Sequence, residues 1–141
     1  MSIEVNKAAV RRFNAEVIGA GDRQAFDSLM DPAFVNHSAP PGSPAGPEGM
    51  WNTFQTVLRP ALDGLTVTIH DQVCEGDMVT TRKTITGTHS GVLMGIEPTG
   101  QSVSIDVIDI VRIKDGRYAE HWGINTLPTV LAQLRRGVSA I

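Results

Sequence analysis

Apolar residues in the first part of the chain recur at intervals of three and four, which is the period of a helix. Gly19 and Gly21 end the first of three expected helices. Asp22 can cap the second, and Pro47 suits the first turn of the third. Their inward residues are Val10, Phe13 and Val17, then Phe26, Leu29 and Met30, then Met50, Phe54, Val57 and Leu58. The stretch 40–47, rich in Pro and Gly, is expected to be a surface loop.

From Leu65 onward apolar and polar residues alternate, which is the period of a strand. Strands are expected at 34–37, 65–74, 78–88, 102–114 and 117–125. Asp115 and Gly116 form a two-residue hairpin signal, and Thr126 can cap a closing helix. Helices followed by a meander of strands predict an α+β fold, with N-terminal helices packed in a curved antiparallel sheet. The whole chain, 1–141, is expected to form a single domain.

Composition narrows the class of protein. The chain is 41% hydrophobic and 19% charged, as in soluble globular proteins. A net charge of -3 without a basic cluster argues against nucleic acid as a partner. The first residues form neither a signal peptide nor a membrane span, so no membrane partner is expected. Cys74 is the single cysteine, which makes a reduced, cytoplasmic setting the default.

One carboxylate stands out on the strand expected at 102–114. Asp109 interrupts an apolar row formed by Val103, Ile105, Val107, Val111 and Ile113. A carboxylate on an apolar face must be hydrogen-bonded, paired with a charge, or kept neutral by a raised pKa. Such groups occur in catalytic sites and also in structural ion pairs. Asp109 is therefore a candidate catalytic residue, with structural pairing as the alternative.

The hairpin extends this candidate site. With Asp115 and Gly116 as the loop, Asp109 faces Trp122, and Glu120 lies on the same side of the sheet. His121 then lies on the opposite side, whereas a bulge near Gly123 would reverse the later residues. Asp109 with Glu120 or His121 makes a plausible acid/base group.

Other polar or aromatic residues are candidates for substrate binding. Asn36 and His37 stand at the mouth of the Pro/Gly loop, where they either meet a ligand or pair at a strand end. His89 can hydrogen-bond the following turn. Arg82 either pairs with a buried carboxylate such as Asp109 or points to solvent, and Trp51 is either core or ligand platform. No paired-cysteine or H-E-x-x-H spacing occurs, so no metal site is expected.

Several short motifs carry a family resemblance that covers nearly the whole chain. They are Phe34-Val-Asn-His37, Glu75-Gly-Asp77, the run from Thr88 to Gln101, Ile108-Asp-Ile110, Asp115-Gly116 and Glu120-His-Trp122. In order and spacing the chain resembles the SnoaL-like polyketide and ester cyclases of the nuclear-transport-factor-2-like superfamily. The resemblance implies a cone-shaped α+β barrel with a ligand pocket, and a homodimer through the outer face of the sheet.

The resemblance also implies a reaction, in which cyclases of this kind close a ring by intramolecular aldol addition without metal or cofactor. In them a His precedes the hairpin Asp-Gly by six residues, and the main acid/base Asp follows its Gly by seven. Here Asp109 and Gly123 stand at those two positions. The expected function is a cofactor-free cyclase or isomerase acting on a hydrophobic, carbonyl-bearing small molecule. Asp109, Glu120 and His121 would do the chemistry. Asn36, His37, Trp51, Arg82, His89 and Trp122 would bind substrate. A non-catalytic binding protein and a hydrolase or dehydratase of the same fold are the alternatives.

Overall fold

The helices in the computed structural model, which describes residues 2–139, lie where the apolar spacing predicts them. Ser2 and Asp22 cap two of them by accepting backbone hydrogen bonds, and Pro47 stands in the first turn of another. The helical elements are α1 (Ile3–Arg12), η1 (Phe13–Gly19), α2 (Arg23–Leu29), α3 (Pro47–Asn52), η2 (Thr53–Leu58) and α4 (Leu127–Ser139). The π-helical η1 and η2 continue α1 and α3 without a break. No helix among the described residues is both long and apolar enough to cross a membrane.

A five-stranded sheet with the order β1-β5-β4-β3-β2 forms the other layer. Its strands are β1 (Met30–Asn36), β2 (Leu62–Glu75), β3 (Met78–His89), β4 (Ser102–Lys114) and β5 (Arg117–Asn125). The α+β class is confirmed, and β2 to β5 form the expected antiparallel sheet, to which β1 adds a parallel pairing with β5. Pro32 lies within β1, which is an edge strand, where the missing backbone N–H interrupts no central pairing.

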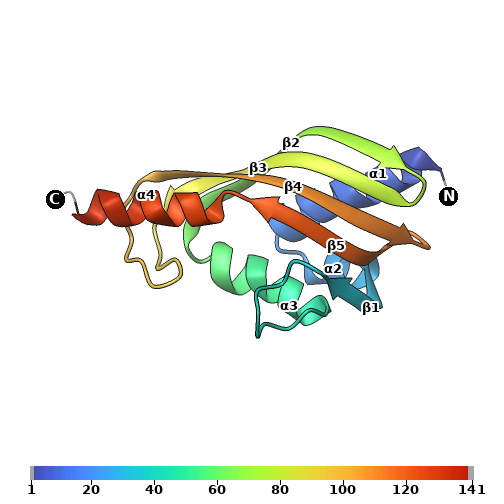
Figure 1. Ribbon diagram of the computed structural model, residues 1–141, viewed down its shortest axis with the longest axis horizontal. Coiled ribbons are helices and arrows are strands. Elements are labelled where there is room, and N and C mark those ends of the chain that lie inside the picture. Colours follow the sequence, from blue (N-terminus) through green and yellow to red (C-terminus); the bar gives the residue numbers. More distant parts are fainter. Residues whose placement is uncertain (1, 140–141) are drawn as a thin grey trace.

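The core fills the space between the sheet and the N-terminal helices, which all cover one face of the sheet (Figure 1). Phe13 from η1 stacks on Tyr118 from β5 at 4.4 Å between ring centroids, so the two layers meet at an aromatic contact. The other face of the sheet exposes Ile108 (46%) and Ile124 (72%). α4 extends beyond the end of the sheet that carries the loop 90–101 (Figure 1).

One irregularity in the hairpin between β4 and β5 decides which side chains reach the inner face. Ile113 pairs with Tyr118 as the loop predicts, but Arg112 pairs with Glu120, which leaves Ala119 without a partner strand residue opposite it. An extra residue of this kind is a β-bulge, and every later side chain of the strand changes face.

Candidate active site

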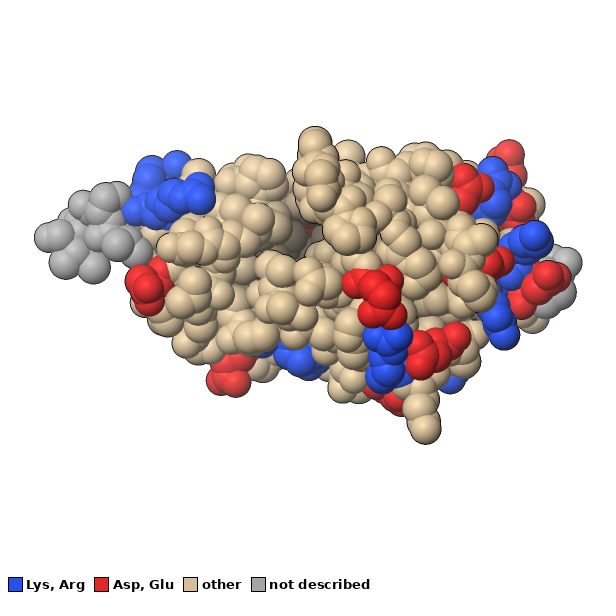
Figure 2. Space-filling model, turned by 90° about the horizontal axis from the view of Figure 1, so that it is seen from below, with Lys and Arg blue, Asp and Glu red and all other residues tan. Residues whose placement is uncertain are grey.

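A cavity of about 470 Å³ lies between the inner face of the sheet and the α3–η2 helix. Much of its wall is apolar and consists of Met50, Phe54, Val57, Leu58, Ile85, Ile105, Val107 and Leu127. Pro40 and Pro44 of the Pro/Gly loop, Ser38 before it, and Met94 from the loop after β3 also line the cavity. Its polar lining includes Glu48, Asn52, Thr53 and Asn125. Figure 2 shows the helix-covered side of the molecule, where a hollow is surrounded mostly by uncharged residues. The volume suits a small organic molecule.

Asp109 lies in the wall of this cavity, on the inner face of β4 as the alternation predicts. Its residue exposure is 5%, and its Oδ2 lies 3.3 Å from both Lys83 Nζ and His121 Nε2. Among the described residues, its Oδ1 is buried without a hydrogen-bond partner. Burial acts to raise the pKa of Asp109, but the Lys83 charge and the His121 hydrogen bond outweigh it and hold that pKa below its ordinary value.

Lys83 is the unexpected member of the site, because the sequence prediction did not include it. It projects from the inner face of β3, is 3% exposed, and donates a 2.7 Å hydrogen bond from Nζ to Asn14 Oδ1. Asn14 belongs to η1 and donates in turn to the Val10 carbonyl at 2.8 Å. A π-helical segment therefore presents the amide that holds the lysine.

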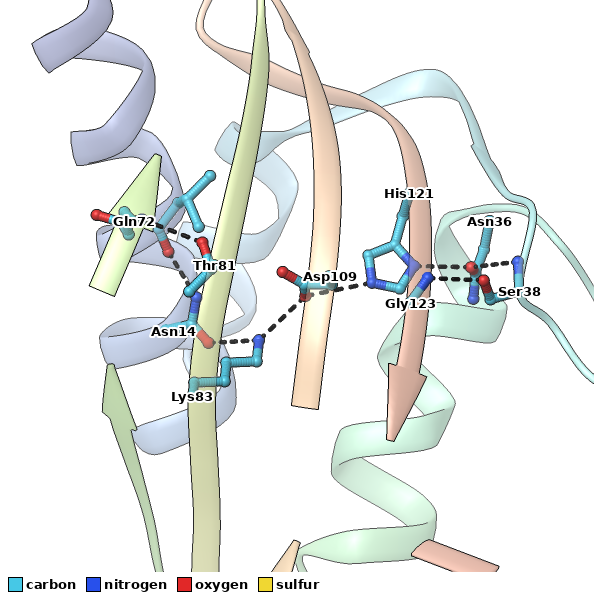
Figure 3. A network of polar contacts seen from close by, with 10 residues as sticks. Asn14, Asn36, Ser38, Gln72, Thr81, Lys83, Asp109, His121 and Gly123 are labelled. Carbon is cyan, nitrogen blue, oxygen red and sulfur yellow. Dashed lines mark hydrogen bonds and ion pairs between the residues drawn. The ribbon is translucent and has the colours of Figure 1, made fainter. Parts of the chain in front are cut away.

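His121 connects Asp109 to the mouth of the cavity (Figure 3). Its Nδ1 lies 2.8 Å from Asn36 Oδ1, which also accepts the Ser38 backbone N–H at 3.0 Å. Because that second bond identifies the Asn36 atom as oxygen, His121 Nδ1 must carry a hydrogen and donate it. The nitrogen facing Asp109 is therefore Nε2. The Nε2–Oδ2 contact is a hydrogen bond only when one proton lies between these two atoms.

Gly123 explains how the His121 ring fits there. Gly123 pairs with Asp109 across β4 and β5. A Cβ added to Gly123 would lie 2.9 Å from His121 Cε1 and 3.2 Å from His121 Nε2. The imidazole thus occupies the space in which a side chain at position 123 would begin. Ser38 Oγ accepts the Gly123 N–H at 2.7 Å and fixes the backbone at this point.

The assignment of Glu120 and Trp122 to the pocket is wrong, because the bulge at Ala119 turns both to the outer face. Glu120 accepts from Arg112 at 2.8 Å and lies 2.8 Å from His37 Nε2. Its hydrogen bond with His37, followed by that with Arg112, holds the pKa of Glu120 below its ordinary value. His37 also stacks on Trp122, with ring centroids 4.8 Å apart. These residues form a surface cluster.

Three further candidates lie outside the cavity lining. Arg82 pairs with Asp71 at 2.9 Å, not with Asp109, because it projects from the outer face of β3. Trp51 packs on Phe26 with ring centroids 5.1 Å apart, and so belongs to the core. The remaining one, His89, is fully buried and its Nδ1 accepts the Thr99 N–H at 3.2 Å. It holds the loop after β3, in agreement with the expected turn contact.

The site therefore combines Asn14, Asn36, Lys83, Asp109 and His121, of which the sequence prediction included three. A signal for the others was present. Lys83 alternates with the buried residues Val79, Thr81 and Ile85, and Asn14 follows Val10 by one helical turn. Within residues 2–139, no group of three or more His, Cys, Asp or Glu side chains is placed to hold a metal ion.

Comparison with known protein families identifies the family of this chain. A family model described as SnoaL-like polyketide cyclase matches residues 8–134. The chain belongs to this family. Among curated proteins, none matches the sequence significantly.

Several solved structures share the fold over nearly the whole chain. TsrD from Streptomyces laurentii is 28% identical with a TM-score of 0.82, over 95% of this chain and 97% of that one. IdmH from Streptomyces antibioticus, a proposed polyketide cyclase, is 33% identical with a TM-score of 0.80, over 92% and 98%. AclR from Streptomyces galilaeus, a proposed hydroxylase, is 26% identical with a TM-score of 0.81, over 96% and 83%.

Proposed function

We propose that this protein is an acid/base enzyme that closes a ring, or shifts a double bond, in a hydrophobic carbonyl compound. The observation that carries the proposal is the Asp109–His121 pair in the wall of an apolar cavity, with the reacting nitrogen set by Asn36. Groups that share a proton in a water-poor site are suited to move protons to and from carbon. Membership of the SnoaL-like polyketide cyclase family supports a cyclase-type reaction.

The reaction follows from the proton that the pair can hold. In its proton-free form the pair takes a proton from a carbon next to a carbonyl, and the electron pair moves to the carbonyl oxygen. The resulting enolate carbon attacks a second carbonyl of the same molecule and forms the new carbon–carbon bond. The pair then returns its proton to the new alkoxide, so that product and substrate have the same composition. The pair can remove a proton from a carbon next to one carbonyl, and a second flanking carbonyl makes that carbon more acidic; the step uses no metal or cofactor.

His121 takes the place of the carboxylate that the family pattern puts at position 123. The ring lies over Gly123, and the absent Cβ leaves room for it. The acid/base group is thus supplied from two residues earlier in β5, with Asp109 as its partner. This arrangement accounts for a glycine at a position where the resemblance leads one to expect an acid.

Hydrogen exchange in a simple ketone tests the proposal without knowledge of the natural substrate. α-Tetralone is an apolar bicyclic ketone, and incorporation of deuterium next to its carbonyl in D2O can be followed by NMR. The wild-type protein should accelerate exchange, and His121→Gln should lower the rate by about a hundredfold. His70→Gln is the matched control, because His70 contacts Thr84 at 2.7 Å away from Asp109 and outside this cavity.

Two results would contradict this proposal. If α-tetralone binds and does not exchange in the wild-type protein, the cavity serves binding, which was the alternative considered from the sequence. If His121→Gln exchanges as fast as His70→Gln, the proton is moved by another group.

We also propose that two copies associate through the outer face of the sheet. Ile108 and Ile124 are exposed on this face, where they border a shallow hollow of about 330 Å³ with Arg82 and Asp106. An apolar patch of this kind is protected from water when a second copy covers it. Light scattering at micromolar concentration should give twice the mass of the chain, and a monomeric mass would contradict the proposal.

A further inference from the structure

Lys83 has a donor that the fold does not use. An ammonium group has three hydrogens to donate. Asn14 Oδ1 accepts one at 2.7 Å, and Asp109 Oδ2 lies in reach of a second at 3.3 Å. No third acceptor for Nζ occurs among the described residues, and Lys83 lines the cavity. A molecule in the cavity can therefore supply the missing acceptor.

The position of Lys83 relative to the acid/base pair selects the kind of acceptor. Lys83 Nζ and His121 Nε2 flank the same oxygen of Asp109, each at 3.3 Å (Figure 3). An oxygen bound at Nζ therefore lies close to the group that removes or returns a proton. A lysine in an apolar, water-poor wall stabilises negative charge on that oxygen far better than water-exposed lysines do.

We propose that Lys83 forms a subsite that binds the oxygen of an enol or phenol as its anion. The ligand O–H gives its proton to the proton-free Asp109–His121 pair, and the oxyanion that remains accepts the third hydrogen of Lys83. No other atom is gained or lost. The inference rests on the proposed function for its catalytic meaning, since an enolate is the intermediate there. It makes Lys83 the residue that stabilises this intermediate.

The colour of 4-nitrophenol reports the subsite directly, because the phenolate and the neutral phenol absorb at different wavelengths. With wild-type protein in excess, the bound dye should show the phenolate band at pH values where the free dye is mostly protonated. Lys83→Met should weaken binding of the phenolate by about tenfold or more, the range for a lost hydrogen bond to a charged group. Lys114→Met removes an exposed lysine at the end of β4 and should leave the spectrum unchanged.

A neutral analogue separates the oxygen subsite from apolar contact. 4-Nitroanisole has the same ring without an ionisable hydroxyl, so its affinity should be the same in wild type and in Lys83→Met. Circular dichroism establishes whether Lys83→Met is folded. If it is not, the wild-type spectrum alone decides, because the ionisation of the bound dye is measured there.

Three outcomes would overturn the inference. They are a bound dye that stays protonated in the wild-type protein, a phenolate that binds Lys83→Met as tightly as wild type, and no binding of the dye at millimolar concentration. This test and the exchange of α-tetralone fail separately. If the dye ionises and the ketone does not exchange, the subsite is kept and the proposed enzyme activity is rejected. If the ketone exchanges and the bound dye stays protonated, the enzyme activity is kept and the subsite is rejected.

Discussion

Replacing Asp109 by Asn should destabilise the protein by about 3 kcal/mol at neutral pH, because it leaves the buried Lys83 without its counter-ion. Lys83 and Asp109 are 3% and 5% exposed, so water compensates little. Removal of one partner of a buried pair costs roughly 3–5 kcal/mol, and the lower end applies because the amide oxygen of Asn can still accept from Lys83. A small domain has roughly 5–15 kcal/mol of stability, so the variant should remain folded.

The pH dependence of this loss follows from the direction of the Asp109 pKa. The pKa is lower in the folded protein than its ordinary value. The carboxylate therefore contributes its full stability above the ordinary pKa of about 4, and this contribution disappears as the pH falls through the folded-state value. Urea denaturation of wild type and Asp109→Asn should give a large difference at pH 7, and the difference should shrink in a series below pH about 4.

Asp63→Asn is the matched control, because Asp63 is an exposed residue of β2 and lies outside the hollow proposed as the dimer contact. Its effect should stay within about 0.5 kcal/mol at either pH. Equal losses for the two variants, or a loss for Asp109→Asn that does not change with pH, would refute the reasoning. The α-tetralone exchange rate of the same variant should fall by about a hundredfold.

Further substitutions test the remaining parts of the site. Gly123→Asp should displace the His121 ring and lower the exchange rate by about tenfold or more. The double variant Gly123→Asp with His121→Ala should regain part of that rate, because the new carboxylate then has room to act. A double variant as inactive as the single one would count against this. Glu120→Gln should leave the exchange rate within about twofold, since Glu120 lies in the surface cluster, and a loss as large as that of His121→Gln would be incompatible with the bulge. If the proposed dimer forms, Ile124→Glu should convert it to a monomer in light scattering, and an unchanged dimer mass would place the interface elsewhere.

The alternation of residues in β4 was sufficient to predict Asp109 as a buried inward carboxylate, because a strand paired on both sides keeps one period throughout. The same test applied to β3 would have found Lys83. The faces of Glu120, His121 and Trp122 could not be read in this way. The hairpin loop determines the register as far as Tyr118, and Ala119 has no feature that marks it as an extra residue.

Local sequence patterns also could not predict which strands pair when they lie far apart in the sequence. β1 pairs in parallel with β5 across most of the chain, and this brings Asn36 beside His121. A parallel neighbour leaves no turn signal, since the connection between the two strands contains three other strands. The sequence therefore predicted Asn36 as a ligand-binding residue at the mouth of a loop. In the structure Asn36 lines the cavity, and its side-chain oxygen also lies 2.8 Å from His121 Nδ1.

The bulge at Ala119 has a consequence for comparisons between relatives. In β5, even-numbered residues such as Tyr118 face inward before the bulge, and odd-numbered residues such as His121 face inward after it. In a relative that lacks the extra residue, the side chains aligned with His121 and Glu120 would exchange environments without any change of residue type. Identical residues at aligned positions can then be a reactive group in one protein and a solvent-facing side chain in the other. A change of chain length by one residue at this point can therefore alter the chemistry of the cavity more than a substitution within it.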